Sequence, residues 1–197
     1  MNKFLSIAIT IVFLAAAVIA QKTKKEDQPS PGSKYPLTAV LVVAPEQCGE
    51  KLKRHHEKFK VGEELCLAVA EVAKQTFQDV KQVEAVPKKG DDPSKIVLSF
   101  KSVDVDATST ATAFGKRTAV LLVEWTATDS AGKVFWVQTI EGKTKERAGN
   151  LFTAKGHKRK MIEDVCENLL ENSVTAIRQS PEFQKVAQKA ASKDVTQ

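Results

Sequence analysis

Apolar residues along the chain fall into short strand-like runs and longer stretches of helical spacing, which together predict an α+β domain. Leu37 to Ala44 (LTAVLVVA) is an almost wholly apolar run stopped by Pro45, as expected for a buried strand. From Val61 to Val80 the apolar residues recur at helical spacing. Glu63 and Glu64 lie in the first turn, where the helix dipole favours acids. This stretch predicts the first long helix.

Three further runs predict strands joined in a meander. In the first, Lys95 to Ala107, apolar residues alternate and then change phase, which predicts a bulge near Lys101 and Ser102. The other two, Arg117 to Thr128 and Lys133 to Thr144, are rich in β-branched and aromatic residues. The short connection between them predicts a hairpin in which Gly132 supplies a positive φ.

A second amphipathic helix is predicted over residues 162–177, ending near Gln179. Ser180, Pro181 and Glu182 then form a fresh helix start, which predicts a short C-terminal helix. The element order is β-α-β-β-β-α, in which the helical crossover makes the first two strands parallel and the hairpins reverse the others. We therefore expect a two-layer α+β fold, with two long helices on one face of a four-stranded, mostly antiparallel sheet.

The first twenty residues predict export from the cytoplasm. Lys3 precedes an uncharged apolar stretch from Phe4 to Ala20, and Val18-Ile19-Ala20 is an acceptable cleavage site before Gln21. A cleaved signal peptide would make the protein periplasmic or secreted. The alternative is an uncleaved membrane anchor, because these 17 residues are close to the shortest stretch that crosses a bilayer about 30 Å thick.

The expected domain organisation follows from these patterns. Residues 1–20 form the signal peptide, and residues 21–36 form a flexible linker, since they are polar and contain Pro, Gly and Ser. Residues 37–183 form a single α+β domain, and residues 184–197 form a polar tail.

Charge adds a candidate binding surface to this fold. The chain carries 30 Lys and Arg against 24 Asp and Glu, a formal net charge of +6. The predicted topology places three connections at one end, beside the starts of both long helices: 46–60, 111–117 and 145–160. Such an end attracts an anionic partner, whether an envelope protein complex or an anionic lipid or glycolipid at a membrane surface. The candidate binding residues are Lys53, Arg54, Lys58, Lys116, Arg117, Lys158, Arg159 and Lys160.

The basic connections also allow a simpler interpretation, in which the lysines are only solvated, as surface lysines usually are. Nucleic acid is not expected as a partner, because the protein is exported and the basic loops lack the interleaved aromatic residues that single strands stack on.

Three cysteines, Cys48, Cys66 and Cys166, are an odd number for an oxidising compartment, so one pair and one leftover is the simplest arrangement. A bridge between Cys48 and Cys66 is preferred, because the loop with Cys48 should return near the first turns of the helix with Cys66. Three unpaired thiols are the alternative.

Motifs for catalysis are weak. The pair His55-His56 is followed by Glu57, but a zinc-binding helix needs a second histidine four residues on, and Lys60 stands at that distance from His56. No phosphate-binding loop or nucleophile elbow occurs. No metal, cofactor or catalytic residue is therefore predicted, and a non-enzymatic binding role is favoured. The alternatives are a small secreted hydrolase-like enzyme with a site in the same loops, and a structural subunit of an envelope assembly.

Residues 95–183 resemble small bacterial envelope lipoproteins of the YajG type and the LPS-assembly lipoprotein. The resemblance rests on KIVLSFKSVDVDA, on the hairpin AVLLVEWTATDSAGKVFWVQTIEG, and on the closing helix followed by SPEF. It implies two helices on a four-stranded sheet and an accessory role in binding an envelope partner or lipid. Those proteins carry a lipid-modified cysteine at the first mature position, whereas here Gln21 follows the export segment and the first cysteine is Cys48. A lipid anchor is therefore not supported by these residues.

Overall fold

The computed structural model describes residues 33–54, 57–90, 92, 94–109, 116–144, 147–148 and 154–194. Within these ranges only the backbone is described for residues 51–54, 57–60, 105–109, 116–117, 147–148, 154–158 and 193–194. The predicted signal peptide and most of the predicted linker lie outside the described residues.

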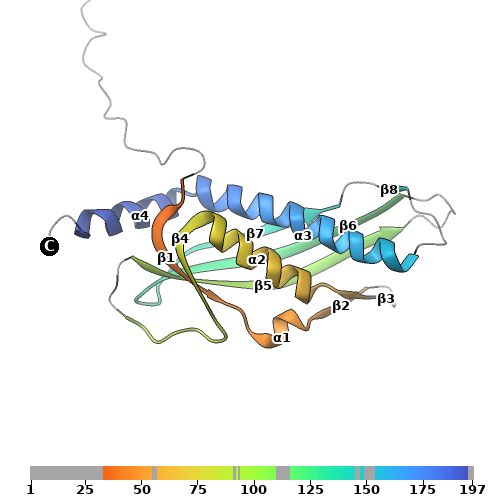
Figure 1. Cartoon of the computed structure of the whole chain (residues 1–197), viewed down its shortest axis with the longest axis horizontal. Helices are drawn as coiled ribbons and strands as arrows, with labels where there is room; N and C mark the ends of the chain where they lie inside the picture. Colours follow the sequence, from red (N-terminus) through yellow and green to blue (C-terminus); the bar gives the residue numbers. More distant parts are fainter. Residues whose placement is uncertain are drawn as a thin grey trace, which may run out of the picture.

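A single sheet forms one layer of the molecule, and helices cover one of its faces (Figure 1). Its strands follow the order β4-β1-β5-β6-β7, and the short strand β8 pairs with the start of β6. β1 runs parallel to both β4 and β5, whereas β5, β6 and β7 form an antiparallel meander. The strands are β1 (Tyr35–Val42), β4 (Phe77–Val83), β5 (Lys95–Ser109), β6 (Lys116–Asp129), β7 (Val134–Lys143) and β8 (Arg147–Ala148).

Two long helices, α2 and α3, pack against each other and on the sheet, and their apolar faces share one core with the inward-facing strand residues. The helices are α1 (Pro45–Cys48), α2 (Gly62–Thr76), α3 (Ala154–Gln179) and α4 (Pro181–Asp194). Between α1 and α2 a separate two-stranded hairpin is formed by β2 (Lys51–Arg54) and β3 (Glu57–Lys60). The predicted α+β class, with helices on one face of the sheet, is confirmed. The sheet is mixed, because β1 has a parallel neighbour on each side, but most of its strand pairings are antiparallel, as predicted.

The extra strand is β4, in a segment predicted as the end of the first helix. α2 ends at Thr76, and Phe77 takes an extended conformation with φ −117° and ψ 153°. Phe77 and Val80 are spaced three apart, which continues the helical spacing of the residues before them. β4 lies at the edge of the sheet and exposes polar residues on both faces, so it lacks the alternation that marks a half-buried strand.

Other local predictions for the strands are confirmed. The pairing of β5 with β6 changes register between Ser102 and Asp104, which is the bulge expected from the phase shift. The turn between β6 and β7 holds Gly132 at φ 82°, a backbone conformation that glycine adopts without strain. Asp129 closes this turn, because its carboxylate accepts a hydrogen bond from the Lys133 N–H at 2.8 Å.

α3 approaches β7 closely at Gly142. A Cβ added to Gly142 would lie 2.4 Å from the carbonyl oxygen of Val165 and 2.8 Å from the Cβ of Leu169, so only glycine fits beneath the helix. On either side of this contact α3 binds the backbone of β7. The Asn172 side chain donates to the Glu141 carbonyl at 2.7 Å, and the Asn168 side-chain oxygen accepts from the Lys143 N–H at 2.9 Å.

Replacing Gly142 by alanine should therefore lower the free energy of unfolding by about 1–3 kcal/mol, since backbone atoms of α3 would have to move away from β7. Gly90→Ala is the matched control, because nothing lies within 4 Å of its added Cβ, and it should change stability by less than about 0.5 kcal/mol. Urea unfolding of both variants would measure the difference, and equal stabilities would contradict the close contact.

α4 closes one end of the core. Ser180 caps this helix, since its hydroxyl accepts a hydrogen bond from the Phe183 N–H at 3.4 Å, and Pro181 occupies the first turn as predicted. The helix continues to Asp194 and buries Ala187 and Ala190, so the packed structure extends past the boundary predicted at residue 183. At the other boundary, β1 begins at Tyr35, inside the predicted linker, and this side chain is buried.

A disulfide joins Cys48, at the end of α1, to Cys66 in the second turn of α2, with a Cα–Cα distance of 5.6 Å. This is the pairing preferred from the sequence, and Cys166 is the free cysteine, buried in the core. The turn before α2 is tight: a Cβ on Gly62 would lie 2.2 Å from the Gln47 carbonyl oxygen. The bridge therefore fixes α1 against the start of α2, on either side of the β2–β3 hairpin.

Candidate functional site

The segments that carry the predicted binding residues lie at one end of the molecule, which we call the basic end: β2, β3, the start of β6 and the start of α3. Figure 1 shows β2, β3, β8 and the first turns of α3 at this same end. The starts of the two long helices are adjacent, because the Arg159 guanidinium lies 3.9 Å from the Glu64 carboxylate. Helix starts add partial positive charge through their free backbone N–H groups.

The eight predicted binding residues occupy four elements. Lys53 pairs in register with Lys58 across the β2–β3 hairpin, and Arg54 pairs with Glu57. Lys116 and Arg117 open β6, where they pair with β8. Lys158, Arg159 and Lys160 lie in the first turns of α3. Only the Arg159 and Lys160 side chains are described, so the orientation of the other six is outside the described part of the chain.

Arg159 and Lys160 both have acidic neighbours. Arg159 pairs with Glu163 at 3.0 Å in addition to Glu64, and Lys160 pairs with Glu163 at 3.6 Å and with Asp164 at 3.2 Å. These carboxylates lower the local positive charge, a feature that the sequence reasoning did not weigh. The side chains of Arg159 and Lys160 remain 77% and 49% exposed, and exposed pairs of this kind are worth only about 0–1 kcal/mol. Both cations thus remain available to a stronger anionic partner.

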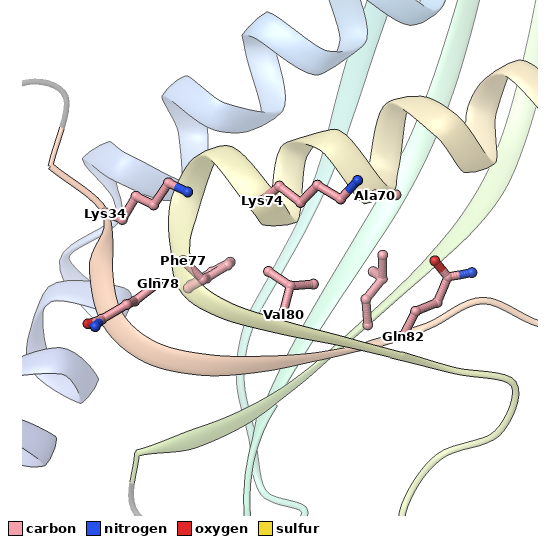
Figure 2. A pocket seen from close by; sticks show the side chains of 8 residues that line it. Lys34, Ala70, Lys74, Phe77, Gln78, Val80 and Gln82 are labelled. Carbon is pink, nitrogen blue, oxygen red and sulfur yellow. The ribbon is translucent and has the colours of Figure 1, made fainter.

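A second surface feature was missed by the sequence reasoning: a groove of about 240 Å³ between α2 and β4, which we call the β4 groove. Figure 2 shows Lys34 and Lys74 on its helix side, with Phe77, Val80 and Gln82 along β4. Its lining residues are Lys34, Leu41, Ala70, Lys74, Phe77, Gln78, Val80 and Gln82. No sequence pattern indicates this groove, because the polar segment around Lys34 is typical of a linker and the apolar spacing in β4 is typical of a helix.

Metal-ligand clusters and a free thiol are two kinds of reactive group that could support catalysis among the described residues. No group of three or more His, Cys, Asp or Glu side chains within the described ranges could hold a metal ion. His55 and His56 lie outside those ranges, as does the side chain of His157. Burial, with a smaller contribution from the charge of Glu64, raises the pKa of the Cys166 thiol to about 12. This thiol is therefore protonated at neutral pH and is a poor nucleophile.

An exposed apolar sheet face bearing Trp125 or Trp136 would support the structural-subunit alternative. Trp125 is fully buried and Trp136 is 7% exposed, so both belong to the core beneath the helices. They do not form the exposed apolar sheet face that such a subunit would present. In the part of the chain that the structure describes, no helix has the length and apolar character needed to cross a bilayer.

Comparison with known proteins gives distant structural likenesses. No protein-family model matches the chain, and no curated protein sequence matches it. A minor lipoprotein from Acinetobacter baumannii is 11% identical with a TM-score of 0.43, and the match covers 73% of this chain and 91% of that one. A Xanthomonas campestris protein of the DUF330 family is 8% identical with a TM-score of 0.45, with coverage of 83% and 91%. A lipoprotein from Neisseria meningitidis is 12% identical with a TM-score of 0.33, with coverage of 69% and 99%.

Two of these three proteins are lipoproteins by name, and none of the three is named as a YajG-type or LPS-assembly protein. With identities of 8–12% and TM-scores of 0.33–0.45, the likenesses assign neither a family nor a function to this chain.

Proposed function

We propose that the protein is an exported, non-enzymatic accessory protein of the bacterial cell envelope, and that its basic end binds an anionic envelope component or the acidic surface of a protein partner. The apolar N-terminal segment supports export, and a positively charged surface suits a compartment bounded by anionic lipids. The observation that carries the proposal is the placement of the four Lys- and Arg-rich elements of the basic end beside the starts of α2 and α3.

The physical mechanism is electrostatic. Each basic residue near an anionic membrane surface contributes about 1 kcal/mol to binding, and the contribution falls off within a Debye length of about 8–10 Å. Several cations on neighbouring elements act together on one anionic partner. Binding through this end should therefore weaken steeply as salt is added, which separates it from binding through apolar contacts.

The test neutralises the first turns of α3 in the variant Lys158→Gln/Arg159→Gln/Lys160→Gln. Affinity for vesicles of phosphatidylglycerol and phosphatidylcholine, measured by sedimentation at low salt, should fall by about tenfold to a hundredfold. The loss should shrink as the salt concentration rises, because screening weakens the wild-type interaction too.

A matched control removes the same number of charges elsewhere. Lys133, Lys185 and Lys189 are exposed and belong to the β6–β7 turn and α4, which Figure 1 places away from the basic end. Replacing these three by glutamine should leave vesicle binding nearly unchanged. Equal losses in the two triple variants would show that only net charge matters. The proposal would be wrong if neither triple variant changed binding to anionic vesicles, to micelles of lipopolysaccharide or to envelope extracts.

A further inference from the structure

The β4 groove lies along an open edge of the sheet. Among the described strands, β4 pairs with β1 alone. The opposite edge is different, because the side chains of Asn168 and Asn172 on α3 bind the outward-facing backbone groups of β7. An uncovered strand edge presents a row of backbone donors and acceptors to any further strand.

The backbone of β4 points toward this open edge at the residues that line the groove. The Val83 carbonyl accepts a hydrogen bond from the Val43 N–H at 2.8 Å, so the backbone groups of Val83 face β1. Successive residues of a strand direct their backbone groups to opposite sides. Gln82 and Val80 therefore direct their N–H and C=O groups away from β1, and their side chains contribute to the groove.

The charged side chains that line the β4 groove are all positive. Its floor is apolar, formed by the buried Leu41 and Phe77 together with Val80, and its lining includes two lysines but no carboxylate. None of the ion pairs formed among the described side chains includes Lys34 or Lys74. Figure 2 shows both ammonium groups on the helix side of the groove, above the β4 side chains.

We propose that β4 accepts an extended acidic segment of a partner protein as an additional strand. Side chains of an added strand alternate between the two faces of the sheet. On the helix face, an acidic side chain would reach Lys34 and Lys74, and an apolar side chain would cover Val80. Main-chain hydrogen bonds to Val80 and Gln82 supply affinity in this mode of recognition, and the groove supplies selectivity.

The size and openness of the groove favour a peptide over a small molecule. Its volume of about 240 Å³ lies below the roughly 300–1,000 Å³ typical of small-molecule sites. One or two side chains of an extended chain fill such a space, while the backbone of that chain pairs with the strand edge. This surface is separate from the basic end, since it lies by the last turn of α2 and the basic end lies by its first (Figure 1).

The test uses the full mature chain and a display library of peptides about ten residues long. Selected peptides should carry an acidic residue and an apolar residue two positions apart, because residues two apart share one face of a strand. One selected peptide, labelled with a fluorophore, then gives an affinity by anisotropy. On binding, amide hydrogen exchange should slow at Val80 and Gln82, which is the signature of new strand pairing.

Gln82 provides a matched pair of variants. Gln82→Pro removes the N–H that points to the open edge and spares the pairing with β1, where proline is tolerated on an edge strand. Gln82→Ala changes the side chain and keeps the N–H. We expect peptide affinity to fall about tenfold or more for Gln82→Pro and to change little for Gln82→Ala. Circular dichroism and thermal unfolding establish that both variants are folded.

The charge contribution is tested separately. Lys34→Glu/Lys74→Glu should lower affinity for the selected peptide about tenfold or more. Lys101→Glu/Lys133→Glu, which reverses two exposed lysines outside the groove, should lower it little. The proposal is overturned if the library yields no acidic extended peptide, or if Gln82→Pro binds as well as Gln82→Ala. It is also overturned if Lys34 and Lys74 affect only binding to phosphatidylglycerol vesicles, which would make the groove a lipid-contact surface.

Discussion

Replacing Phe183 by alanine should lower the free energy of unfolding by about 3–5 kcal/mol, the range found when a large buried aromatic side chain is removed. Phe183 is fully buried at the start of α4. Its ring lies 5.1 Å from that of Phe135 and 5.2 Å from that of Trp136, in edge-to-face arrangements. The rings of Tyr35 and Phe77 lie 6.2 and 5.8 Å away.

Chemical unfolding monitored by tryptophan fluorescence would measure this loss, because Trp136 is part of the same cluster. Leu67→Ala is a suitable control, since Leu67 is 64% exposed on α2, and its truncation should cost less than about 0.5 kcal/mol. If Phe183→Ala were no more destabilising than Leu67→Ala, α4 would not be part of the folded core. The chain would then end its packed structure at α3, near the boundary predicted from the sequence.

The same cluster explains why the domain boundaries were only partly predictable. Tyr35 stands between Lys34 and Pro36 in a polar segment, and this pattern predicts a linker. In the structure its hydroxyl donates to the Arg178 carbonyl at 3.1 Å. Burial raises the pKa of Tyr35 above its ordinary value, and the charge of Arg178 opposes this shift. A single aromatic residue between polar neighbours has no periodicity, so only the tertiary contacts reveal its role.

α4 shows a related limit of hydrophobic patterning. Its start was predictable because Ser180 and Pro181 have specific roles at a helix N-terminus. Its length was not, because the buried positions after Phe183 include Ala187 and Ala190, and alanine occurs on both faces of helices. Small residues let a helix approach a core closely while contributing little to a hydrophobic pattern.

Strands were predictable where they are central or closed by a defined turn. β6 and β7 combine alternation with a glycine-containing turn, and both were predicted. β4 and the β2–β3 hairpin were not. β4 is an edge strand that buries few side chains on a consistent face, and the sequences of β2 and β3 are rich in charged residues and lack apolar alternation. As a result, chain order predicted that the segments of the basic end lie together, and their role in binding stays a prediction. The β4 groove, which depends on an unpredicted edge strand, was not predictable.

The second large effect expected is at the disulfide. The double variant Cys48→Ala/Cys66→Ala should lose about 3 kcal/mol of stability, because the bridge closes a loop with a sequence separation of 18 residues and thereby restricts the unfolded chain. For a domain of this size the loss corresponds to a fall in melting temperature of roughly 6–12 °C. Treating the wild type with a reductant should reproduce the fall, while the double variant should be indifferent to reductant.

Loss of the disulfide should loosen one segment of the folded protein more than the rest. It fixes α1 and the start of α2 at both ends of the segment that contains β2 and β3. Local opening of that segment should therefore become easier in the double variant than opening of the central strands β5 and β6. Limited proteolysis should cut the double variant first between Gly49 and Val61, and the wild type should be cut there only after reduction. Cleavage that begins elsewhere in the double variant, with residues 49–61 intact, would show that the surrounding packing, rather than the bridge, holds this part of the basic end.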